Sequence, residues 1–89
     1  MFAIVYEKRF FKDLDRLPDA DVERIMISVK DLAHDPMPNG SKKLKSKSGI
    51  DIYRIRQGDY RVIYLIDRVA QRVNVQSVRH RKDVYKNIP

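Results

Sequence analysis

The sequence contains no cysteine in its 89 residues. This absence excludes disulfide bonds, thiolate metal ligands and a cysteine nucleophile, so packing alone must hold the fold together. A chain of this length buries one modest core. We therefore expect a single domain over residues 1–89.

Long apolar runs are also absent. The apolar runs, such as VIYLI at residues 62–66, are far shorter than the ~20 residues that cross a membrane. The amino end, MFAIVYEKRF, lacks the charged-then-apolar order of a signal peptide. We expect a cytoplasmic protein with no membrane partner.

Acidic residues are scarce in the second part of the chain. Residues 1–35 hold six Lys/Arg and eight Asp/Glu, a net charge of −2, whereas residues 36–89 hold thirteen and four, a net charge of +9. A one-sided positive field attracts polyanions, of which nucleic acid comes first and an anionic membrane second. A solvated face that only keeps the protein soluble explains the surface charge alone equally well.

The few carboxylates of this basic part show no metal-binding spacing. They are Asp51, Asp59, Asp67 and Asp83, scattered at predicted turns and ends, and they do not gather ligands for Mg²⁺. The lysine- and serine-rich segment GSKKLKSKSG lacks the GKS/T ending of a phosphate-binding loop before a helix. We expect neither a metal nor a cofactor, and no nucleoside triphosphate site.

Hydropathy periods predict the first three elements. Residues 2–6, FAIVY, are uncharged and rich in β-branched and aromatic side chains, which is typical of a strand covered on both faces. Apolar residues then recur at helical spacing in residues 7–17 and 19–35, and each segment ends at a proline. We expect an antiparallel helical hairpin whose second helix is capped by Asp19 or Asp21.

The remaining residues predict a loop and a β-meander. Residues 36–50 hold two prolines, two glycines and four lysines, and we expect a mobile basic loop. Strand patterns cover residues 51–57, 60–67 and 71–79, with turns at Gly58-Asp59 and 67–70. A polar tail follows. The prediction is an α+β fold in which the amino-terminal strand, the helical hairpin and a three-stranded antiparallel meander form one sheet with helices on one face.

Three arginines lie in the predicted strand pair. Side chains alternate along a strand, so Tyr53 and Ile55 point to the core while Arg54 and Arg56 point to the open face. Arg61 on the paired strand can join them near the turn. Arginines that lie close together repel unless an anion binds, which favours phosphate recognition. Arginine also solubilises strand edges without any ligand, so this alternative stays open.

The last strand and the tail carry further candidates. Val73 and Val75 share the parity of Arg79, which places these three side chains on one face. If the tail folds back along the sheet, Arg81 and Tyr85 converge on the arginines. Tyr85 either anchors the tail or stacks on a base. Two other candidates have equally plain alternatives: His80 is a strand-end residue or a proton carrier near neutral pH, and Lys42, Lys43, Lys45 and Lys47 form a solvated loop or assist beside a polyanion.

Two segments resemble the RelE/ParE superfamily of bacterial toxins from toxin–antitoxin pairs. They are KLKSKSGIDIYRIRQGDYRVIYLI at residues 43–66 and VQSVRHRKDVYKNI at residues 75–88, preceded by the helical hairpin. The resemblance spans nearly the whole chain and implies a helical hairpin on an antiparallel sheet. It also implies a cognate antitoxin that wraps the toxin, which is itself a monomer within a toxin–antitoxin hetero-oligomer.

The superfamily contains two activities. RelE-like members are endoribonucleases that cut mRNA in the ribosomal A site, whereas ParE-like members inhibit DNA gyrase and lack the basic catalytic set. The positions of that set match Arg54, Arg56, Arg61, Arg81 and Tyr85 here, which favours the RelE type. The first two positions are usually lysine in the best-known RelE-like sequence. Other branches use a Glu and His pair, and this chain has lysines and serines where that Glu would fall.

The resemblance implies a metal-independent reaction in which a ribose 2′-OH attacks the adjacent phosphorus. Arg56 and Arg61 would clamp the developing phosphate charge, Arg81 would help the 5′-oxygen to leave, and Tyr85 would stack on or orient a base. The expected substrate-binding residues are Arg54, Lys45, Lys47 and His80.

The residue sequence does not identify the general base of this reaction. Arginine has a pKa above ~12 and is a poor proton acceptor, so His80, Lys45 or ribosomal RNA would activate the 2′-OH. The expected partners are the antitoxin, the ribosome and mRNA. A ParE-like gyrase inhibitor and a non-catalytic RNA- or ribosome-binding domain are the alternatives.

Overall fold

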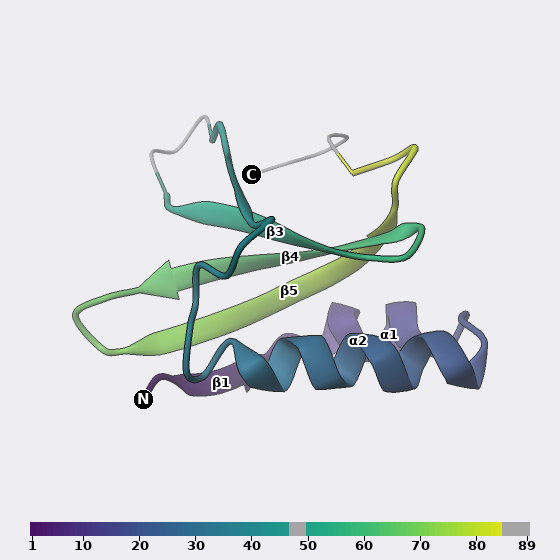
Figure 1. Cartoon of the computed structure of the whole chain (residues 1–89), viewed down its shortest axis with the longest axis horizontal. Coiled ribbons are helices and arrows are strands. Elements are labelled where there is room, and N and C mark those ends of the chain that lie inside the picture. The colour runs from purple at the N-terminus through teal and green to yellow at the C-terminus, as the bar shows by residue number, and fades with distance from the viewer. Residues whose placement is uncertain (47–49, 85–89) are drawn as a thin grey trace.

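The computed structural model describes residues 1–46 and 50–84 (Figure 1). Two helices follow the first strand, as the hydropathy periods predict, and four strands come after them in the described residues where three were expected. In chain order the elements are β1 (Ala3–Tyr6), α1 (Lys8–Leu14), α2 (Asp19–Asp31), β2 (Lys42–Leu44), β3 (Ile52–Gln57), β4 (Tyr60–Asp67) and β5 (Arg72–His80).

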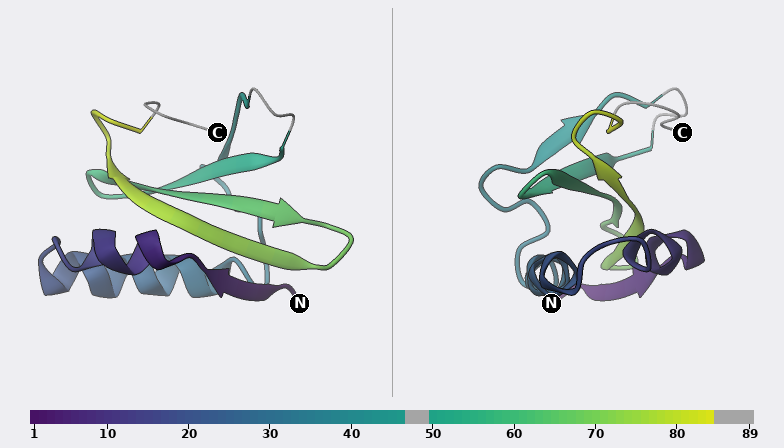
Figure 2. Two further views of the ribbon diagram at one scale, coloured as in Figure 1. Left: turned by 180° about the vertical axis from the view of Figure 1, so that it is seen from behind. Right: turned by 90° about the vertical axis from the view of Figure 1, so that its right-hand side faces the viewer.

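All five strands form one sheet in the order β1-β5-β4-β3-β2. The strand β1 pairs with β5 in parallel, and the other three pairs are antiparallel. Both helices run along one side of the sheet, while the segment after β5 lies on the other side (Figures 1 and 2). The α+β prediction with helices on one face is confirmed.

The strand β2 was not predicted, because its segment was expected to be a mobile basic loop. Its three residues pair with β3, with Lys42 opposite Arg54 and Leu44 opposite Ile52. Leu44 is buried, and the two lysines before it are exposed. A strand with a single apolar residue among lysines has no recognisable period, so only the tertiary contact of Leu44 defines it.

The helix ends also differ from the prediction. Pro18 is the N-cap of α2, and its carbonyl oxygen accepts hydrogen bonds from the backbone N–H groups of Asp21 and Val22, at 3.0 and 3.1 Å. Asp19 and Asp21 lie in the first turn and make no capping bond, although their charges suit the positive end of the helix. The helix α2 ends at Asp31, and a turn leads on to Pro36.

The main core lies between the helices and the sheet. Tyr64, Phe10 and Ile25 are its largest fully buried side chains. A second, smaller cluster lies on the other face, where Leu44, Ile52 and Ile63 are covered by Val84 from the segment after β5. Both faces of the sheet are therefore partly covered. The members of the main core are Phe10, Leu14, Ile25, Val29, Leu32, Tyr53, Ile55, Val62, Tyr64, Ile66, Val73, Val75 and Val78.

A bulge in β5 reverses its alternation. Tyr64 lies opposite Val75 and Ile63 lies opposite Ser77, so Gln76 has no partner in this register. Beyond the bulge Val78 joins the main core, and Arg79 lies opposite Arg61. Directly opposed side chains share a face. The parity rule, which placed Arg79 on the face of the earlier valines, is therefore wrong for this residue, because one inserted residue shifts the period.

The helix α1 continues the sheet edge where β1 ends. The last bond of the parallel pair is donated by the Glu7 N–H to the Val75 carbonyl, at 2.9 Å. The next part of β5 is met by α1, whose Asp13 carboxylate accepts a hydrogen bond from the Val78 N–H at 2.9 Å. This contact satisfies an edge donor and fixes α1 beside the end of β5. Neither described helix is long and apolar enough to cross a membrane.

Candidate functional site: an arginine cluster at the β3–β4 turn

Arginines converge on the face of the sheet that the helices leave open. Arg56 on β3 lies opposite Arg61 on β4, and Arg61 lies opposite Arg79 on β5. Burial lowers the pKa of Arg61, and the positive charges of Arg56, Arg54 and Arg81 lower it further. Like charges therefore surround Arg61, and binding an anion would relieve their repulsion.

The Arg61 side chain is held over the turn between β3 and β4. Its Nη1 atom donates to the carbonyl oxygens of Gly58 and Tyr60, both at 3.0 Å. Gly58 has a φ of +60°, a left-handed conformation that glycine adopts without strain. The turn thus orients the guanidinium and leaves it half-buried.

Arg81 reaches the cluster because the chain leaves β5 beside the same turn. The Arg81 N–H donates to the Asp59 carbonyl at 2.8 Å, and its Nε lies 3.8 Å from Oδ1 of the Asp59 carboxylate. The structure therefore brings together Arg56, Arg61 and Arg81. Tyr85, the fourth expected catalytic residue, lies outside the described residues, although Val84 before it is buried.

Arg54 was expected on the open face but is buried, with 6% of its surface exposed. It does share a face with Arg56, since it lies opposite Ile63 of the second cluster. Its Nη1 donates to the Gly40 carbonyl at 2.7 Å. The segment before β2 therefore covers it, which sequence alternation could not indicate because the covering residues are distant in the chain. Arg54 contributes charge to the cluster from below its surface.

His80 lies opposite Tyr60, with the two rings in an edge-to-face arrangement and centroids 5.9 Å apart. Its Nδ1 accepts a hydrogen bond from the Lys82 N–H at 3.2 Å. In the neutral imidazole, an accepting Nδ1 leaves the proton on Nε2. His80 can therefore donate a hydrogen bond from Nε2. It can accept a proton only at Nδ1, after the bond from Lys82 opens.

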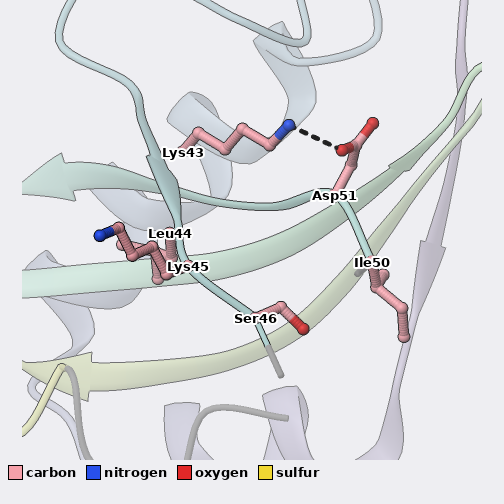
Figure 3. Close-up of a pocket in the computed structure, with 6 residues that line it drawn as sticks. All are labelled: Lys43, Leu44, Lys45, Ser46, Ile50 and Asp51. Carbon is pink, nitrogen blue, oxygen red and sulfur yellow. Dashed lines mark ion pairs between the residues drawn. The ribbon is translucent and has the colours of Figure 1, made fainter. Parts of the chain in front are cut away.

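The expected lysines lie at the other end of β3. Lys43 forms an ion pair with Asp51, with Nζ 3.0 Å from Oδ1, while Lys45 points away from this pair (Figure 3). These residues line a hollow of about 440 Å³. Leu44, next to Lys45, pairs with Ile52, which is about 13 Å along β3 from Arg56. The structure does not bring Lys45 into the cluster, and Lys47 lies outside the described residues.

Two residues near the cluster were not selected as site residues from the sequence, and a third, Lys42, was named only with the lysines of the expected loop. Lys42 lies opposite Arg54, Arg79 lies opposite Arg61, and Asp59 partly offsets the cationic charge around Arg61. The positions of Lys42 and Arg79 depend on strand register, which the sequence did not indicate for β2 or beyond the bulge. Asp59 could have been found from the sequence, since it occupies the turn that carries the arginines.

The arrangement suits a phosphate ligand. Guanidinium groups match the geometry of phosphate oxygens and stay charged at neutral pH. Among the described residues, no three His, Cys, Asp or Glu side chains lie close enough together to hold a metal ion. What the cluster offers chemically is a preorganised set of cations with one neighbouring carboxylate.

Comparisons with known proteins match this fold over nearly all of the chain. A family model described as ParE toxin of type II toxin–antitoxin system, parDE, matches residues 4–85. The chain is also similar to the toxin RelE1 of Methanocaldococcus jannaschii, with 30% identity in an alignment of 90 positions that covers 97% of this chain and 97% of that protein.

Solved structures of RelE proteins are also similar to this chain over most of its length. The RelE–RelB complex from Pyrococcus horikoshii superimposes with a TM-score of 0.79 at 29% identity, over 90% of this chain and 94% of that chain. The RelB–RelE complex from Methanococcus jannaschii gives a TM-score of 0.69 at 27% identity, over 96% and 99%. The intact Escherichia coli RelBE complex, at 20% identity and a TM-score of 0.69 over 88% and 94%, is similar in fold.

Proposed function

The chain belongs to the RelE/ParE superfamily of toxins from type II toxin–antitoxin systems, and we propose that it is a ribosome-dependent endoribonuclease that cuts mRNA in the A site. The observation that carries this proposal is the convergence of cationic charge on Arg61 at the β3–β4 turn. A gyrase inhibitor would need no such cluster, whereas a phosphate-cleaving site does.

The proposed reaction begins with attack of a ribose 2′-oxygen on the adjacent phosphorus. The new bond joins O2′ to phosphorus, the bond from phosphorus to O5′ breaks, and a 2′,3′-cyclic phosphate remains. The 2′-OH loses its proton and the leaving 5′-oxygen gains one. Arg56 and Arg61 stabilise the negative charge that grows on the phosphate oxygens, because the turn already orients the Arg61 guanidinium and Arg56 lies opposite it on the same face.

Arg81 assists the leaving oxygen in this scheme. Its contact with the Asp59 carbonyl holds the start of the tail beside Arg61, so its guanidinium can contact the far side of the same phosphate. Tyr85 would then orient a base. Arg54, buried below the surface, raises the local potential and supports the loop at Gly40 rather than contacting the phosphate directly.

Removal of the 2′ proton needs a group outside the cluster of arginines. The Nδ1 lone pair of His80 already accepts a hydrogen bond from the Lys82 N–H, and Lys45 lies at the opposite end of β3. We therefore propose that ribosomal RNA and the fixed position of the substrate promote the attack, since orientation alone can contribute a large rate gain. The purified toxin should then leave RNA intact in the absence of ribosomes. Efficient cleavage of free RNA would contradict the proposal that the reaction depends on the ribosome.

A cognate antitoxin completes the proposal. Two of the similar structures are toxin–antitoxin complexes from archaea. The net charge of +9 over residues 36–89 favours an acidic covering segment. Such a segment, rich in charge and poor in apolar residues, stays disordered until it binds.

The test is expression in a translating cell extract, with mRNA 5′ ends mapped. The wild type should produce cuts inside the A-site codon. The double variant Arg61→Ala with Arg81→Ala should lose at least about 100-fold of the cleavage, the scale expected when preorganised charge is removed. The matched control is Lys30→Ala with Arg72→Ala, which removes the same charge from exposed positions away from the turn and should keep full activity. Ribosome binding without any cleavage would favour a non-catalytic binding domain instead.

The description of the matching family as a ParE toxin favours gyrase inhibition as a second candidate. Growth arrest by this route would not depend on Arg61 and Arg81. Arrest that persists in the double variant, with intact mRNA and inhibited DNA supercoiling, would support the gyrase activity and contradict the nuclease.

A further inference from the structure

The row of cations on the sheet does not stop at β5. Arg56, Arg61 and Arg79 lie opposite one another on three adjacent strands. Beyond β5, burial lowers the pKa of Arg79, and the positive charge of Arg9 on α1 lowers it further. Each cation thus lies close to the next, from β3 across β4 and β5 to α1.

A hollow of about 280 Å³ lies between α1 and the end of β5, where this row leaves the sheet. Arg9, Arg16 and Arg79 line it together with His80 and the carboxylates of Asp13 and Asp83. Lys12 borders a neighbouring hollow that shares Arg9, Asp13 and Arg16. The surface is concave and carries more positive than negative side chains.

The Asp13 carboxylate anchors α1 to β5 and forms an ion pair with Arg9. Its Oδ2 accepts the Val78 N–H at 2.9 Å and lies 3.9 Å from the Arg9 Nε. The first contact fixes α1 against β5. Within residues 1–46 and 50–84, Lys12 and Arg16 are exposed and form no ion pair. They are therefore free to meet an anionic ligand.

We propose that Arg9, Lys12 and Arg16, continuing the row from Arg79, form a second binding site for a phosphodiester backbone. This inference rests on the proposed function, because the site would hold the RNA strand next to the phosphate that reacts at Arg61. The strand would cross β3, β4 and β5 rather than run along them. The row spans about 10 Å over the sheet before α1 extends it, which is long enough to contact more than one phosphate.

The contacts predict binding without base recognition. Arginine and lysine side chains on an exposed surface contact phosphates, which position a nucleic acid but carry no sequence information. The exposed aromatic residue of α1, Phe11, packs against Tyr6 and Phe10, with centroids 5.3 and 5.6 Å away. It is thus engaged with neighbouring rings, and charge dominates the hollow.

The test compares two double variants that remove the same charge. Arg9→Gln with Arg16→Gln alters the proposed site, while Lys30→Gln with Arg72→Gln alters exposed positions elsewhere. The probe is a fluorescein-labelled oligodeoxynucleotide, which has no 2′-OH and so cannot be cut. Binding is measured by fluorescence anisotropy between 50 and 200 mM salt. A plot of the logarithm of the binding constant against the logarithm of the salt concentration falls with a slope of about 0.7 for each phosphate contact that a single strand makes. Thermal unfolding of each variant checks that the fold is kept.

The variant at α1 should show a slope shallower by about 1.4 and binding about tenfold weaker at the lowest salt, while the control variant keeps the wild-type slope. Equal losses of oligonucleotide affinity in both variants would show that only the net charge of the protein matters, and would contradict a binding site at α1. No loss in the α1 variant would also overturn it. So would loss of binding to a polyglutamate peptide with unchanged oligonucleotide binding, which would assign the surface to an acidic peptide.

Sedimentation with ribosomes separates the two sources of the phosphodiester. A binding deficit on vacant ribosomes assigns the contact to ribosomal RNA, and a deficit only on mRNA-programmed ribosomes assigns it to mRNA. The nuclease can fail independently: intact mRNA with the wild type would refute cleavage, while a slope change at α1 would still support the site. Conversely, cleavage that needs Arg61 and Arg81, without a slope change at α1, refutes the second site alone.

Discussion

Arg81 contacts Asp59 twice, through its backbone N–H to the carbonyl oxygen at 2.8 Å and through its guanidinium to the carboxylate at 3.8 Å. The first contact attaches the tail to the β3–β4 turn. The second involves two exposed groups, and such pairs contribute little to stability because solvent screens them. The backbone contact therefore places Arg81, and the side-chain contact adjusts the charge of the site.

Asp59→Asn should increase nucleic-acid affinity without altering the fold. Removing the carboxylate leaves the backbone contact with Arg81 in place and adds one net positive charge beside Arg61. We expect tighter binding of a single-stranded oligodeoxynucleotide at low salt and a steeper salt dependence. Urea unfolding should stay within about 0.5 kcal/mol of the wild type. Asp21→Asn, at a comparable exposed pair with Arg24, serves as the control, and equal affinity gains in both variants would contradict a local effect.

Arg54 and Arg56 offer a matched comparison on one strand and one face. Arg54→Ala removes a buried side chain and its hydrogen bond to the Gly40 carbonyl, and should lower the free energy of unfolding by about 2–3 kcal/mol. Arg56→Ala removes an exposed side chain and should change it by less than about 0.5 kcal/mol. Urea denaturation followed by circular dichroism measures both. Equal effects would show that the burial of Arg54 does not stabilise the fold.

Val84 should stabilise the protein although it lies beyond the last strand. It is 3% exposed and packs on Leu44, Ile52 and Ile63, so Val84→Ala should cost about 1–2 kcal/mol through lost burial and a small cavity. Val69, which is 98% exposed, is the control, and Val69→Ala should have no measurable effect. Because Val84 precedes Tyr85, its loss should also reduce mRNA cleavage. A stable variant with full activity would contradict this role of the segment.

Tyr64 should make stability depend on pH in the alkaline range. Burial raises the pKa of Tyr64 far above its ordinary value, which is about 10 in the unfolded chain. Between these two values the unfolded state has lost the proton that the folded state keeps. Stability is therefore full below about pH 10 and falls above it, by about 1.4 kcal/mol per pH unit.

The variant Tyr64→Phe isolates this effect. It loses the hydrogen bond from the phenol to the Pro36 carbonyl, at 2.6 Å, and should be about 1 kcal/mol less stable at pH 7. Above pH 10 its stability should fall less steeply than that of the wild type, since the other titrating groups are common to both proteins. Urea unfolding at several pH values from 7 to 11 measures the two slopes, and parallel slopes would contradict the prediction.

The sequence predicted the fold where apolar residues follow a period. Both helices and the strands β3, β4 and β5 were found in this way, with bounds that differ by a few residues at most. The strand β2 was missed because its only buried residue is Leu44. One apolar side chain cannot define a period, and the pairing of β2 with β3 depends on contacts with residues that follow it in the chain.

The arginine cluster was predicted in part. Alternation placed Arg56 near Arg61, and the fold-back of the tail brought Arg81 to them, as the residue pattern suggested. Burial of Arg54 was not predictable, because its covering segment near Gly40 lies 14 positions earlier in the chain. The division of charge between the two parts of the chain also hid the cations of α1, which belong to the acidic part by sequence but adjoin the basic face in space.

The bulge at Gln76 makes the two faces of β5 depend on strand register, which composition does not reveal. If Gln76 entered the ladder, strict alternation would turn Ser77 and Arg79, rather than Val78, to the interior, whereas deleting Gln76 would remove the bulge and leave Val78 inside. A one-residue slip of β5 against β4 would thus break up the row of arginines although every side chain of the sequence is kept. Natural variants of this protein should therefore tolerate loss of the bulge residue and keep the pairing of Ser77 with Ile63 and of Arg79 with Arg61.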